Sequence, residues 1–433
     1  MGLNLYISNV GKLQKAEIKI NGLTVISGEN DTGKSTVGKL IYSLVKTMNT
    51  YDAADLNKIK FILLFNLCDL VKILGRNMQR RSSVFKKIEQ EIFEYSYEIV
   101  RRKRLLTGFA SNLEDYDKKI SSLTIEQICV MFDKVSDYAA KHKNFMTKEV
   151  KEKVEEYKDV LYQFKNRELQ FSVAMTDRLK SCMGNILTNS QCIEKEGKVV
   201  LKLNALNIIE AKVASSNILL TEYNEDNSAY IFDDATYIET PLVLNDRFIT
   251  GENRVSPQAD LIEKINSKDT ISNFDAELFK DIDIGNIQFE KDKLTYKTSK
   301  DASPLMTMAM ASGVKSMNLL KILYCKKKIG NPSNLVIVDE PENHLHPEWQ
   351  VKYAELIVKM IDEGGYVVLT SHSPYLIEAL YYYAKQYKLA EEKVSFYFSE
   401  KIDGTNFAEI RETKDLSIIF DKLSKPLEKL AWD

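Results

Sequence analysis

One short segment near the start of the chain combines glycines, a lysine and hydroxyl side chains at a spacing suited to phosphate chemistry. The segment reads Gly28-Glu29-Asn30-Asp31-Thr32-Gly33-Lys34-Ser35 and follows the apolar run 23–27. Backbone N–H groups of such a loop, and of a helix that starts behind it, can surround triphosphate oxygens, with no Cβ in the way at position 33. Lys34 is expected to bring charge to the β- and γ-phosphates, and Ser35 to ligate Mg²⁺. The expected nucleotide contacts are Gly28, Asn30, Asp31, Thr32, Gly33, Lys34, Ser35 and Thr36.

Two carboxylates follow an apolar run in the last third of the chain. The run 335–338 ends in Asp339 and Glu340, the form that a buried parallel strand takes where its C-terminal end meets a magnesium nucleotide. Asp339 is expected to hold Mg²⁺ together with Ser35, and Glu340 to activate the attacking water as a catalytic base. The alternative is a strand that simply ends in solvated acids.

Three of the four histidines lie close behind these acids, at His344, His346 and His372. His372 directly follows the apolar run 366–369, and a histidine beside the phosphate loop can reach a γ-phosphate, so we expect it to act with Lys34 in catalysis. A structural histidine is the alternative. His344 and His346 could instead ligate a metal, but neither a cysteine nor a third histidine accompanies them.

A turn of small residues precedes a third apolar pattern. The segment 311–316 reads ASGVKS and leads into a helical pattern that includes Leu319 and Leu323. A small-residue turn that starts a helix can bind an anion. An ordinary helix cap is the alternative.

The residues between these motifs predict the elements that position them. No proline occurs before Pro241, and the glycine-poor segment 47–185 shows helical spacing, so it predicts a helical block. Two sets of apolar residues predict helices there, the second as a short coiled-coil-like arm: Val84, Ile88, Ile92, Tyr95 and Ile99, then Val150, Val154, Tyr157, Leu161 and Phe164. Short apolar runs predict strands of an α/β core at 18–26, 199–203, 218–223, 287–289, 335–338 and 366–369.

The motifs occur in a recognisable order: the phosphate loop, ASGVKS, then VIVDEPENHLHP at 336–347 and TSHSP at 370–374. Together they resemble the ABC-type ATPase heads of the SMC, RecF and OLD families, most closely on the OLD and RecF side. The resemblance implies an α/β P-loop NTPase fold of the ABC-ATPase head type with a large helical insertion. It divides the chain into an ATPase lobe at 1–46, the insertion at 47–185, a mostly β remainder of the first lobe at 186–300, and the second lobe at 301–433.

The same resemblance implies composite ATP sites, two per dimer, in a homodimer or higher homo-oligomer. Ser312 and Gly313 would contact the γ-phosphate bound to the opposite subunit. The segment 342–346 would match the D-loop that crosses between subunits, with His344 at the nucleotide. The sequence ASGVK stands where transporters have LSGGQ, and no Q-loop glutamine can be assigned.

Charge and cysteine content narrow the possible functions. The chain has 433 residues, and 60 Lys and Arg against 62 Asp and Glu leave a net charge of -2, which excludes a globally basic nucleic-acid coat. The segment 76–104 is locally basic, and could contact DNA or form a solvated helix face. The 5 cysteines form no CxxC pair, which argues against a zinc site or a disulfide framework. We expect no signal peptide, no membrane span and a cytoplasmic protein.

The resemblance leads to one functional hypothesis and two alternatives. OLD proteins carry a C-terminal TOPRIM nuclease, for which the segment after His372 is too short, and Asp281 and Asp283 fit a loop better than a nuclease metal site. Heads without a nuclease resemble ATP-sensing subunits of prokaryotic antiviral defence systems, which act with a separately encoded nuclease or toxin. The alternatives are a RecF-like repair clamp on duplex DNA and a cytosolic transport subunit, and the signature disfavours the latter.

Overall fold

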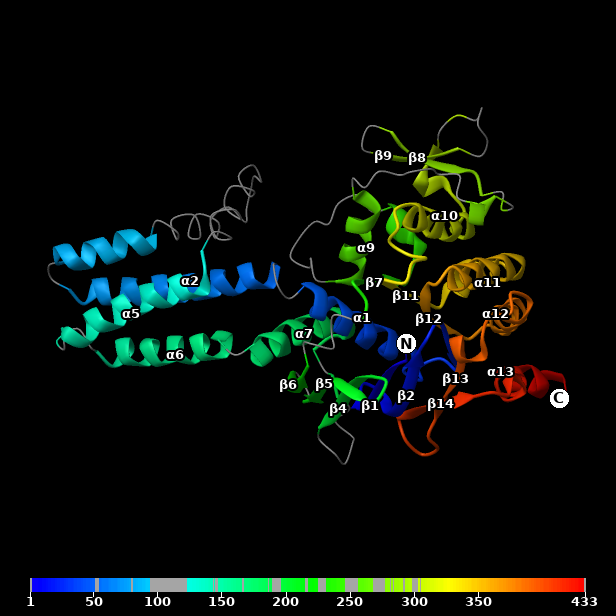
Figure 1. The fold of residues 1–433 in the computed structure, drawn as a ribbon, viewed down its shortest axis with the longest axis horizontal. Helices are drawn as coiled ribbons and strands as arrows, with labels where there is room; N and C mark the ends of the chain where they lie inside the picture. The colour runs from blue at the N-terminus through cyan, green and yellow to red at the C-terminus, as the bar shows by residue number, and fades with distance from the viewer. Residues whose placement is uncertain are drawn as a thin grey trace. The chain divides into compact units, whose positions relative to one another are not determined.

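The structure is a computed structural model. It describes residues 2–50, 54–78, 81–93, 123–142, 144, 147–165, 167–185, 187–188, 196–214, 217–224, 231–245, 256–267, 277–280, 282, 284–290, 293–297, 303 and 305–431. The chain divides into two units, which we call the sheet unit, 1–49 with 172–433, and the helical unit, 50–171. Each is considered by itself (Figure 1).

An 11-stranded sheet forms the centre of the sheet unit, in the order β6-β5-β4-β1-β2-β14-β13-β3-β12-β11-β7. Its strands are β1 Leu3–Val10, β2 Leu13–Ile20, β3 Leu23–Gly28, β4 Gly197–Leu203, β5 Leu206–Val213, β6 Ile218–Tyr223, β7 Asp234–Ile238, β11 Asn334–Asp339, β12 Tyr366–Ser371, β13 Val394–Lys401 and β14 Ala408–Thr413. The fold is α/β, as the sequence predicts.

The five strands β13, β3, β12, β11 and β7 run parallel to one another. Every residue of β3 and β11 is buried, because continuous apolar runs suit strands that are covered on both faces. Register pairs Ile26 with Thr370 and Asp339 with Thr370 on the two sides of β12. The carboxyl ends of β3, β12 and β11 therefore lie next to one another at one edge.

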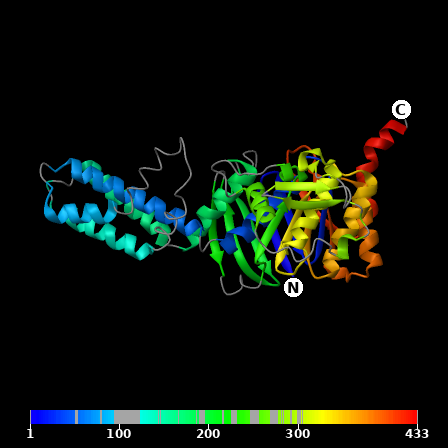
Figure 2. The ribbon, with the colours of Figure 1, turned by 90° about the horizontal axis from the view of Figure 1, so that it is seen from above.

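Helices cover both faces of this parallel half. Helices α10 Ser312–Cys325, α11 Pro347–Asp362 and α12 Pro374–Gln386 share one apolar core with the strands, and follow one another along one side of the sheet unit in Figures 1 and 2. On the other face lies α1 Lys34–Thr50, where a Cβ on Gly38 would stand 2.9 Å from Ile337 of β11. The helix that follows the phosphate loop is thus packed directly on the strand that ends in Asp339.

The antiparallel strands continue the sheet to β6, with alternating burial along β1 and β2. Helix α7 Arg167–Met183 contributes two hydroxyls to this edge. Ser172 Oγ accepts the N–H of Leu220 at 2.8 Å, and Thr176 Oγ1 accepts the N–H of Ile218 at 2.9 Å. At the opposite edge, β7 packs against α9 Pro257–Asn266.

Two buried lysines and two partly buried aspartates join α1, β7 and α9. Lys46 Nζ lies 2.8 Å from Asp234 and 2.6 Å from Asp260. Lys264 Nζ lies 2.8 Å from Asp234 and 3.1 Å from Asp260. Burial opposes the charges, but Lys264 and Lys46 still lower the pKa of Asp234 below its usual value.

The remaining elements of the sheet unit are η2 Pro241–Asn245, η3 Glu277–Phe279, β8 Asn286–Glu290, β9 Lys293–Lys297, β10 Leu305–Met306, η4 Thr307–Ala309, η5 Pro341–His344, η6 Glu391–Lys393 and α13 Leu416–Ala431.

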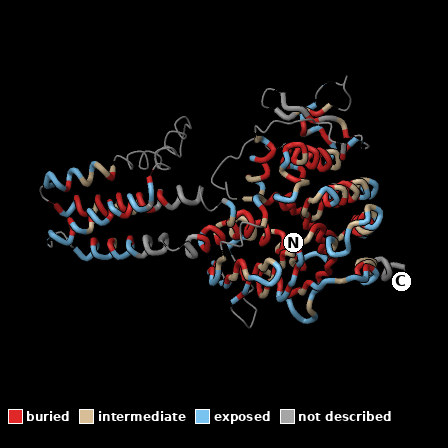
Figure 3. Tube along the Cα trace, viewed as in Figure 1, coloured by how far each residue is buried: buried red, intermediate tan, exposed pale blue. Residues whose placement is uncertain are grey.

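The helical unit has an apolar core of its own (Figure 3). Its elements are α2 Ala54–Arg76, a helix at 83–93, α5 Ile125–Lys141, α6 Lys148–Lys165 and the first turns of α7. A capping box at Thr124 and Gln127 starts α5. The rings of Phe132 and Tyr157 stack between α5 and α6 with centroids 4.2 Å apart.

Two predictions about individual elements are wrong. The run 18–26 is divided between β2 and β3 by a turn at Asn21 and Gly22. Of the residues whose spacing predicts the helix at 83–93, Ile88 and Ile92 pack in the core, but Val84 is 57% exposed and its neighbour Phe85 is buried in its place. Val150, Val154 and Tyr157 are buried as the arm pattern predicts, and α6 packs against α2 within a helical bundle. Tyr95 and Ile99, and the side chains of Leu161 and Phe164, lie outside the described residues.

No helix in the described ranges is long and apolar enough to cross a membrane.

Candidate functional site

The phosphate loop lies between β3 and α1, as predicted, and its glycines are required by close packing. Gly28 has a φ of +145°, and a Cβ there would collide with the carbonyl oxygen of Ser399 on β13. Gly33 has a φ of +82°, and its Cβ would stand 2.7 Å from Leu13 Cδ2. Ser399 Oγ also donates to the Thr32 carbonyl at 2.8 Å. Neighbouring strands thus fix the loop backbone.

Lys34 begins α1 and is almost completely buried. Its Nζ donates to the carbonyl oxygens of Gly28 at 3.0 Å and Glu29 at 2.7 Å. Glu340 Oε1 lies 3.7 Å from the same atom. Burial lowers the pKa of Lys34, and nearby carboxylates oppose that effect. The ammonium is therefore a poorly hydrated positive charge directly behind the loop.

Asp339, at the end of β11, accepts hydrogen bonds from three hydroxyl groups. Ser35 Oγ donates to Oδ1 at 3.0 Å, Thr370 Oγ1 also donates to Oδ1, and Tyr237 OH donates to Oδ2 at 2.8 Å. Burial is the main cause that raises the pKa of Tyr237 well above its usual value, and the negative charge of Asp339 is the second. The phenol therefore stays protonated. Three hydroxyls from α1, β12 and β7 thus hold one carboxylate in place.

A hydroxyl next to a carboxylate is oxygen chemistry that suits Mg²⁺. The described part of the chain contains no cluster of three or more His, Cys, Asp or Glu residues suited to a metal. Mg²⁺ commonly takes only one or two protein oxygens and completes its shell with phosphate and water. The pair Ser35 and Asp339 therefore fits Mg²⁺ that arrives with a nucleotide.

Glu340 adopts a left-handed backbone conformation, with φ 46° and ψ 55°, which costs about 1–3 kcal/mol for a residue other than glycine. Its N–H contacts Thr370 O at 3.2 Å and Thr370 Oγ1 at 3.1 Å. Its Oε2 accepts from Asn343 Nδ2 at 3.2 Å, and its Oε1 lies 3.8 Å from His372 Nδ1. His372 is the largest cause that lowers the pKa of Glu340 to about 2. The carboxylate is thus ionised and held toward Lys34 and His372.

His372 follows β12 and stands between two carboxylates. Its Nδ1 lies 3.2 Å from Glu342 Oε1, closer than to Glu340. Glu340, with Glu342, raises the pKa of the imidazole above its usual value, although burial and Lys34 oppose this. The ring is 36% exposed. It can therefore carry a positive charge near neutral pH while it remains accessible from solvent.

The structure brings five predicted residues together: Lys34, Ser35, Asp339, Glu340 and His372. The remaining predicted residues lie around or away from this group. Glu29, Asn30 and Asp31 are exposed on the loop, where Asp31 pairs with Lys12, and the Thr36 N–H donates to Gly33 O at 3.1 Å.

Other predicted residues are not joined to this group by the contacts above. Ser312 and Gly313 form the first turn of α10. His344 ends η5, and its side chain is outside the described residues, as are Asp281 and Asp283. Arg101, Arg102 and Arg104 of the basic segment also lie in an undescribed range. Their roles stay predictions.

Three residues of the site were not predicted as members: Tyr237, Thr370 and Glu342. Thr370 lies inside the TSHSP motif, and Glu342 lies two residues after Glu340, so motif position could have indicated both. Tyr237 belongs to β7, a strand that was not predicted, and its hydrogen bond spans 102 residues of sequence. Only the pairing of β7 with β11 shows its role.

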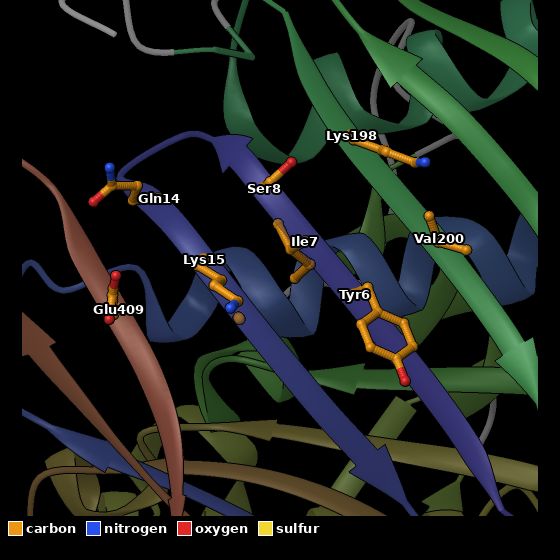
Figure 4. Close-up of a pocket in the computed structure, with 9 residues that line it drawn as sticks. Tyr6, Ile7, Ser8, Gln14, Lys15, Lys198, Val200 and Glu409 are labelled. Carbon is orange, nitrogen blue, oxygen red and sulfur yellow. The ribbon is translucent and has the colours of Figure 1, made fainter. Parts of the chain in front are cut away.

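A surface hollow of about 320 Å³ lies on the antiparallel half of the sheet (Figure 4). Side chains of β1, β2, β4 and β14 line it, among them Tyr6, Lys15, Lys198, Val200 and Glu409. None of the residues around Asp339 belongs to this hollow. The hollow is therefore separate from the group of residues around Asp339 at the carboxyl ends of the parallel strands.

Comparison with known proteins gives relatives of several kinds. Over 52 residues the chain is 35% identical to Septu protein PtuA of Bacillus thuringiensis, a match that spans 12% of this chain and 13% of that protein. The solved SMC head bound to the C-winged helix domain of ScpA is similar with a TM-score of 0.45 and 12% identity, covering 96% of this chain and 98% of that one. The SMC head domain from Thermotoga maritima gives a TM-score of 0.40 and 11% identity, covering 96% of this chain and 100% of that one.

The model of the AAA ATPase domain family matches residues 3–377. That range includes the phosphate loop, the carboxylates after β11 and the histidine after β12. A match over most of the length, with this constellation inside it, identifies the protein as a member of the AAA ATPase domain family.

Proposed function

We propose that the protein binds ATP with Mg²⁺ at the carboxyl ends of β3, β11 and β12 and hydrolyses the γ-phosphate. The observation that carries this proposal is the convergence of Lys34, Ser35, Asp339, Glu340 and His372 from three separate segments. Each has the side chain that one step requires, and membership of an ATPase family supports the same reaction.

The side chains divide the work in a way that follows from their contacts. Lys34 would exchange two loop carbonyls for phosphate oxygens, which form stronger charge-assisted bonds with an ammonium. Ser35 and Asp339 would hold Mg²⁺, which neutralises charge on the phosphates when bound. Glu340, ionised by its surroundings, would accept a hydrogen bond from the attacking water and orient it, a role that a low pKa favours over full removal of the proton. His372, on the other side of Glu340, would donate a hydrogen bond toward the leaving phosphate.

We also propose that two copies share their ATP sites and regulate a separately encoded effector, a nuclease or a toxin. Ser312 and Gly313 form the first turn of α10, and the resemblance assigns this turn to the ATP site of a neighbouring subunit. The short match to Septu protein PtuA supports a role in antiviral defence. ATP would then hold two subunits together until it is hydrolysed.

Glu340→Gln tests the hydrolytic step. The variant should bind ATP normally and hydrolyse it about 100-fold more slowly, the scale of a lost general base. Glu391→Gln, an exposed glutamate in η6, is the matched control and should behave like the wild type. Phosphate release and nucleotide binding measure the two effects separately. An unslowed Glu340→Gln enzyme would contradict the assignment of the base.

The same variant tests the shared site. Because ATP persists in it, Glu340→Gln should accumulate as a dimer or larger assembly on addition of ATP, measured by light scattering. Adding Ser312→Arg should prevent the assembly while each chain still binds ATP. Assembly that does not depend on ATP in either variant would show that the sites are not composite.

A further inference from the structure

Glu342 is a carboxylate buried inside the sheet unit, although the resemblance places its segment at a contact between subunits. Its side chain is 4% exposed. Its Oε1 accepts from Ser371 Oγ at 2.8 Å and from the N–H of His372 at 2.6 Å. Both donors belong to the two residues at the end of β12. Glu342 thus faces its own chain and ties η5 to the segment that carries His372.

The buried carboxylate of Glu342 depends on its hydrogen bonds for stability. A buried carboxylate is strongly unfavourable unless donors compensate for lost water. Here both donors contact Oε1, while Oε2 is buried with no hydrogen-bond partner among the described residues. A buried carboxylate with one oxygen that lacks a hydrogen-bond partner lowers the stability of the fold. A neutral asparagine or serine could hold the same turn without this loss. The negative charge of Glu342 therefore has a role of its own at this position.

That charge acts on the ring of His372. Nδ1 is buried and lies 3.2 Å from Glu342 Oε1, within ion-pair distance, although it makes no hydrogen bond among the described residues. A carboxylate near Nδ1 favours a proton on that nitrogen, so Nε2 also carries a proton only in the positively charged ring, which the same carboxylate stabilises. Nε2 is then the nitrogen left to meet a phosphate.

We propose that Glu342 is a positioning residue, which fixes the backbone and the ring orientation of His372 so that Nε2 presents a proton to the γ-phosphate. It acts through His372 and does not contact the nucleotide. The inference rests on the hydrolytic function proposed above and assigns to this residue a role within one chain.

A double-mutant cycle with Glu342→Gln and His372→Asn tests this role. Glutamine keeps the shape and an acceptor for Ser371 and the His372 N–H, but it removes the charge. Glu342→Gln should lower kcat about tenfold, as for other residues that orient an active group, and leave KM for ATP nearly unchanged. In the His372→Asn background the same substitution should have almost no further effect, since its route of action is gone. If the two substitutions lowered kcat independently, so that their factors multiplied in the double variant, the proposal would be overturned.

A second readout does not depend on turnover. The chain has 4 histidines, and His372→Asn identifies the ring signals of His372 in an NMR titration. The charged groups around this ring are Glu340, Glu342 and Lys34. Because a negative charge favours the protonated ring, Glu342→Gln should lower its pKa and change its tautomer signature. Unchanged ring signals would overturn the proposal even if hydrolysis slows.

Ser371→Ala covers the case in which Glu342→Gln does not fold. It removes one donor to Glu342 and leaves both charges and the ring in place, so kcat should fall by a smaller factor and again only when His372 is present. Failure of the hydrolytic function itself would be visible separately. In that case the wild type would not release phosphate, while the ring titration would still show whether Glu342 orients His372.

Discussion

Asp339 shows how a single carboxylate is prepared for a cation by its neighbours. Hydroxyls of Ser35, Thr370 and Tyr237 donate to its two oxygens, and the side chain has little freedom to rotate. Hydrogen-bonded partners of this kind orient a metal ligand before the metal arrives, which reduces the entropy lost on binding. Tyr237 lies on β7, outside both the phosphate loop and the segment that carries His372, so it can be changed without altering either.

Tyr237→Phe should therefore weaken Mg²⁺ binding and leave metal-free nucleotide binding intact. Loss of the hydroxyl removes one donor to Asp339 Oδ2, and we expect the Mg²⁺ concentration for half-maximal hydrolysis to rise about tenfold. Titration of Mg²⁺ against activity and against nucleotide affinity measures the two effects. Tyr42→Phe is the matched control, since the buried Tyr42 hydroxyl has no hydrogen-bond partner among the described residues. Equal effects of both substitutions would contradict the role of Tyr237.

The pair His372 and Glu340 predicts a pH dependence of stability with a definite sign. The folded pKa of His372 is raised, so its contribution is complete below the unfolded value near 6.5 and is lost as pH rises through the folded value. The folded pKa of Glu340 is lowered to about 2, so its contribution is lost only as pH falls below its usual value of 4.5. Between about pH 6 and pH 9 the change should thus come from His372.

His372→Asn should accordingly lower the thermal midpoint more at pH 6 than at pH 9. Thermal unfolding of both proteins in one set of buffers measures the difference. If the thermal midpoints of the two proteins differed more at pH 9 than at pH 6, the imidazole would be neutral in the folded protein.

At the scale of elements, the four charges between α1, β7 and α9 hold the far end of the helix that begins with Lys34. Lys264 is 7% exposed and pairs with both Asp234 and Asp260. Lys264→Met should leave the partly buried Asp234 and Asp260 with one lysine and lower the free energy of unfolding by about 2–3 kcal/mol, less than for a fully buried pair. Urea unfolding measures this.

An exposed ion pair provides the comparison. Lys352 and Glu348 are one helical turn apart on α11, and Lys352 is 41% exposed. Lys352→Met should cost less than about 1 kcal/mol, because water screens such a pair. Similar losses for the two lysines would show that burial of the four charges is not what makes them matter.

The sequence predicts the phosphate loop and the carboxylates after β11 because each lies in one continuous segment. A glycine-bracketed loop or an apolar run that ends in acids is visible without knowing which strands pair. The sequence does not predict β7, because its apolar run is short, and it predicts a strand across 18–26, where Asn21 and Gly22 in fact form a turn. Tyr237 reaches Asp339 only through strand pairing across 102 residues, which local pattern does not encode.

At the scale of the whole molecule, each unit has its own core. Phe132 and Tyr157 are buried in the core of the helical unit and stack on each other. Phe132→Ala should lower the stability of that unit by about 3–5 kcal/mol. ATP affinity, which depends on the sheet unit, should change by less than about twofold because the two units have separate cores and their contributions are independent.

Hydrogen exchange separates these two effects. Amides of α2, α5 and α6 should exchange faster in Phe132→Ala, while those of β3 and β11 should not. Val130→Ala, on the same helix but 53% exposed, is the control and should change neither. Faster exchange throughout both units would show that they unfold together.

The two hydroxyls that α7 presents to β6 affect the tendency of the protein to aggregate at high concentration. β6 is the last strand of a long sheet, and the outward N–H groups of a last strand are a template on which another extended chain can add. Ser172 and Thr176 already occupy two of these groups, at Leu220 and Ile218. A helix that closes a sheet with side-chain oxygens leaves no continuous ladder for a foreign strand. The segment by which the chain returns to its sheet thereby also protects the protein from edge-to-edge aggregation.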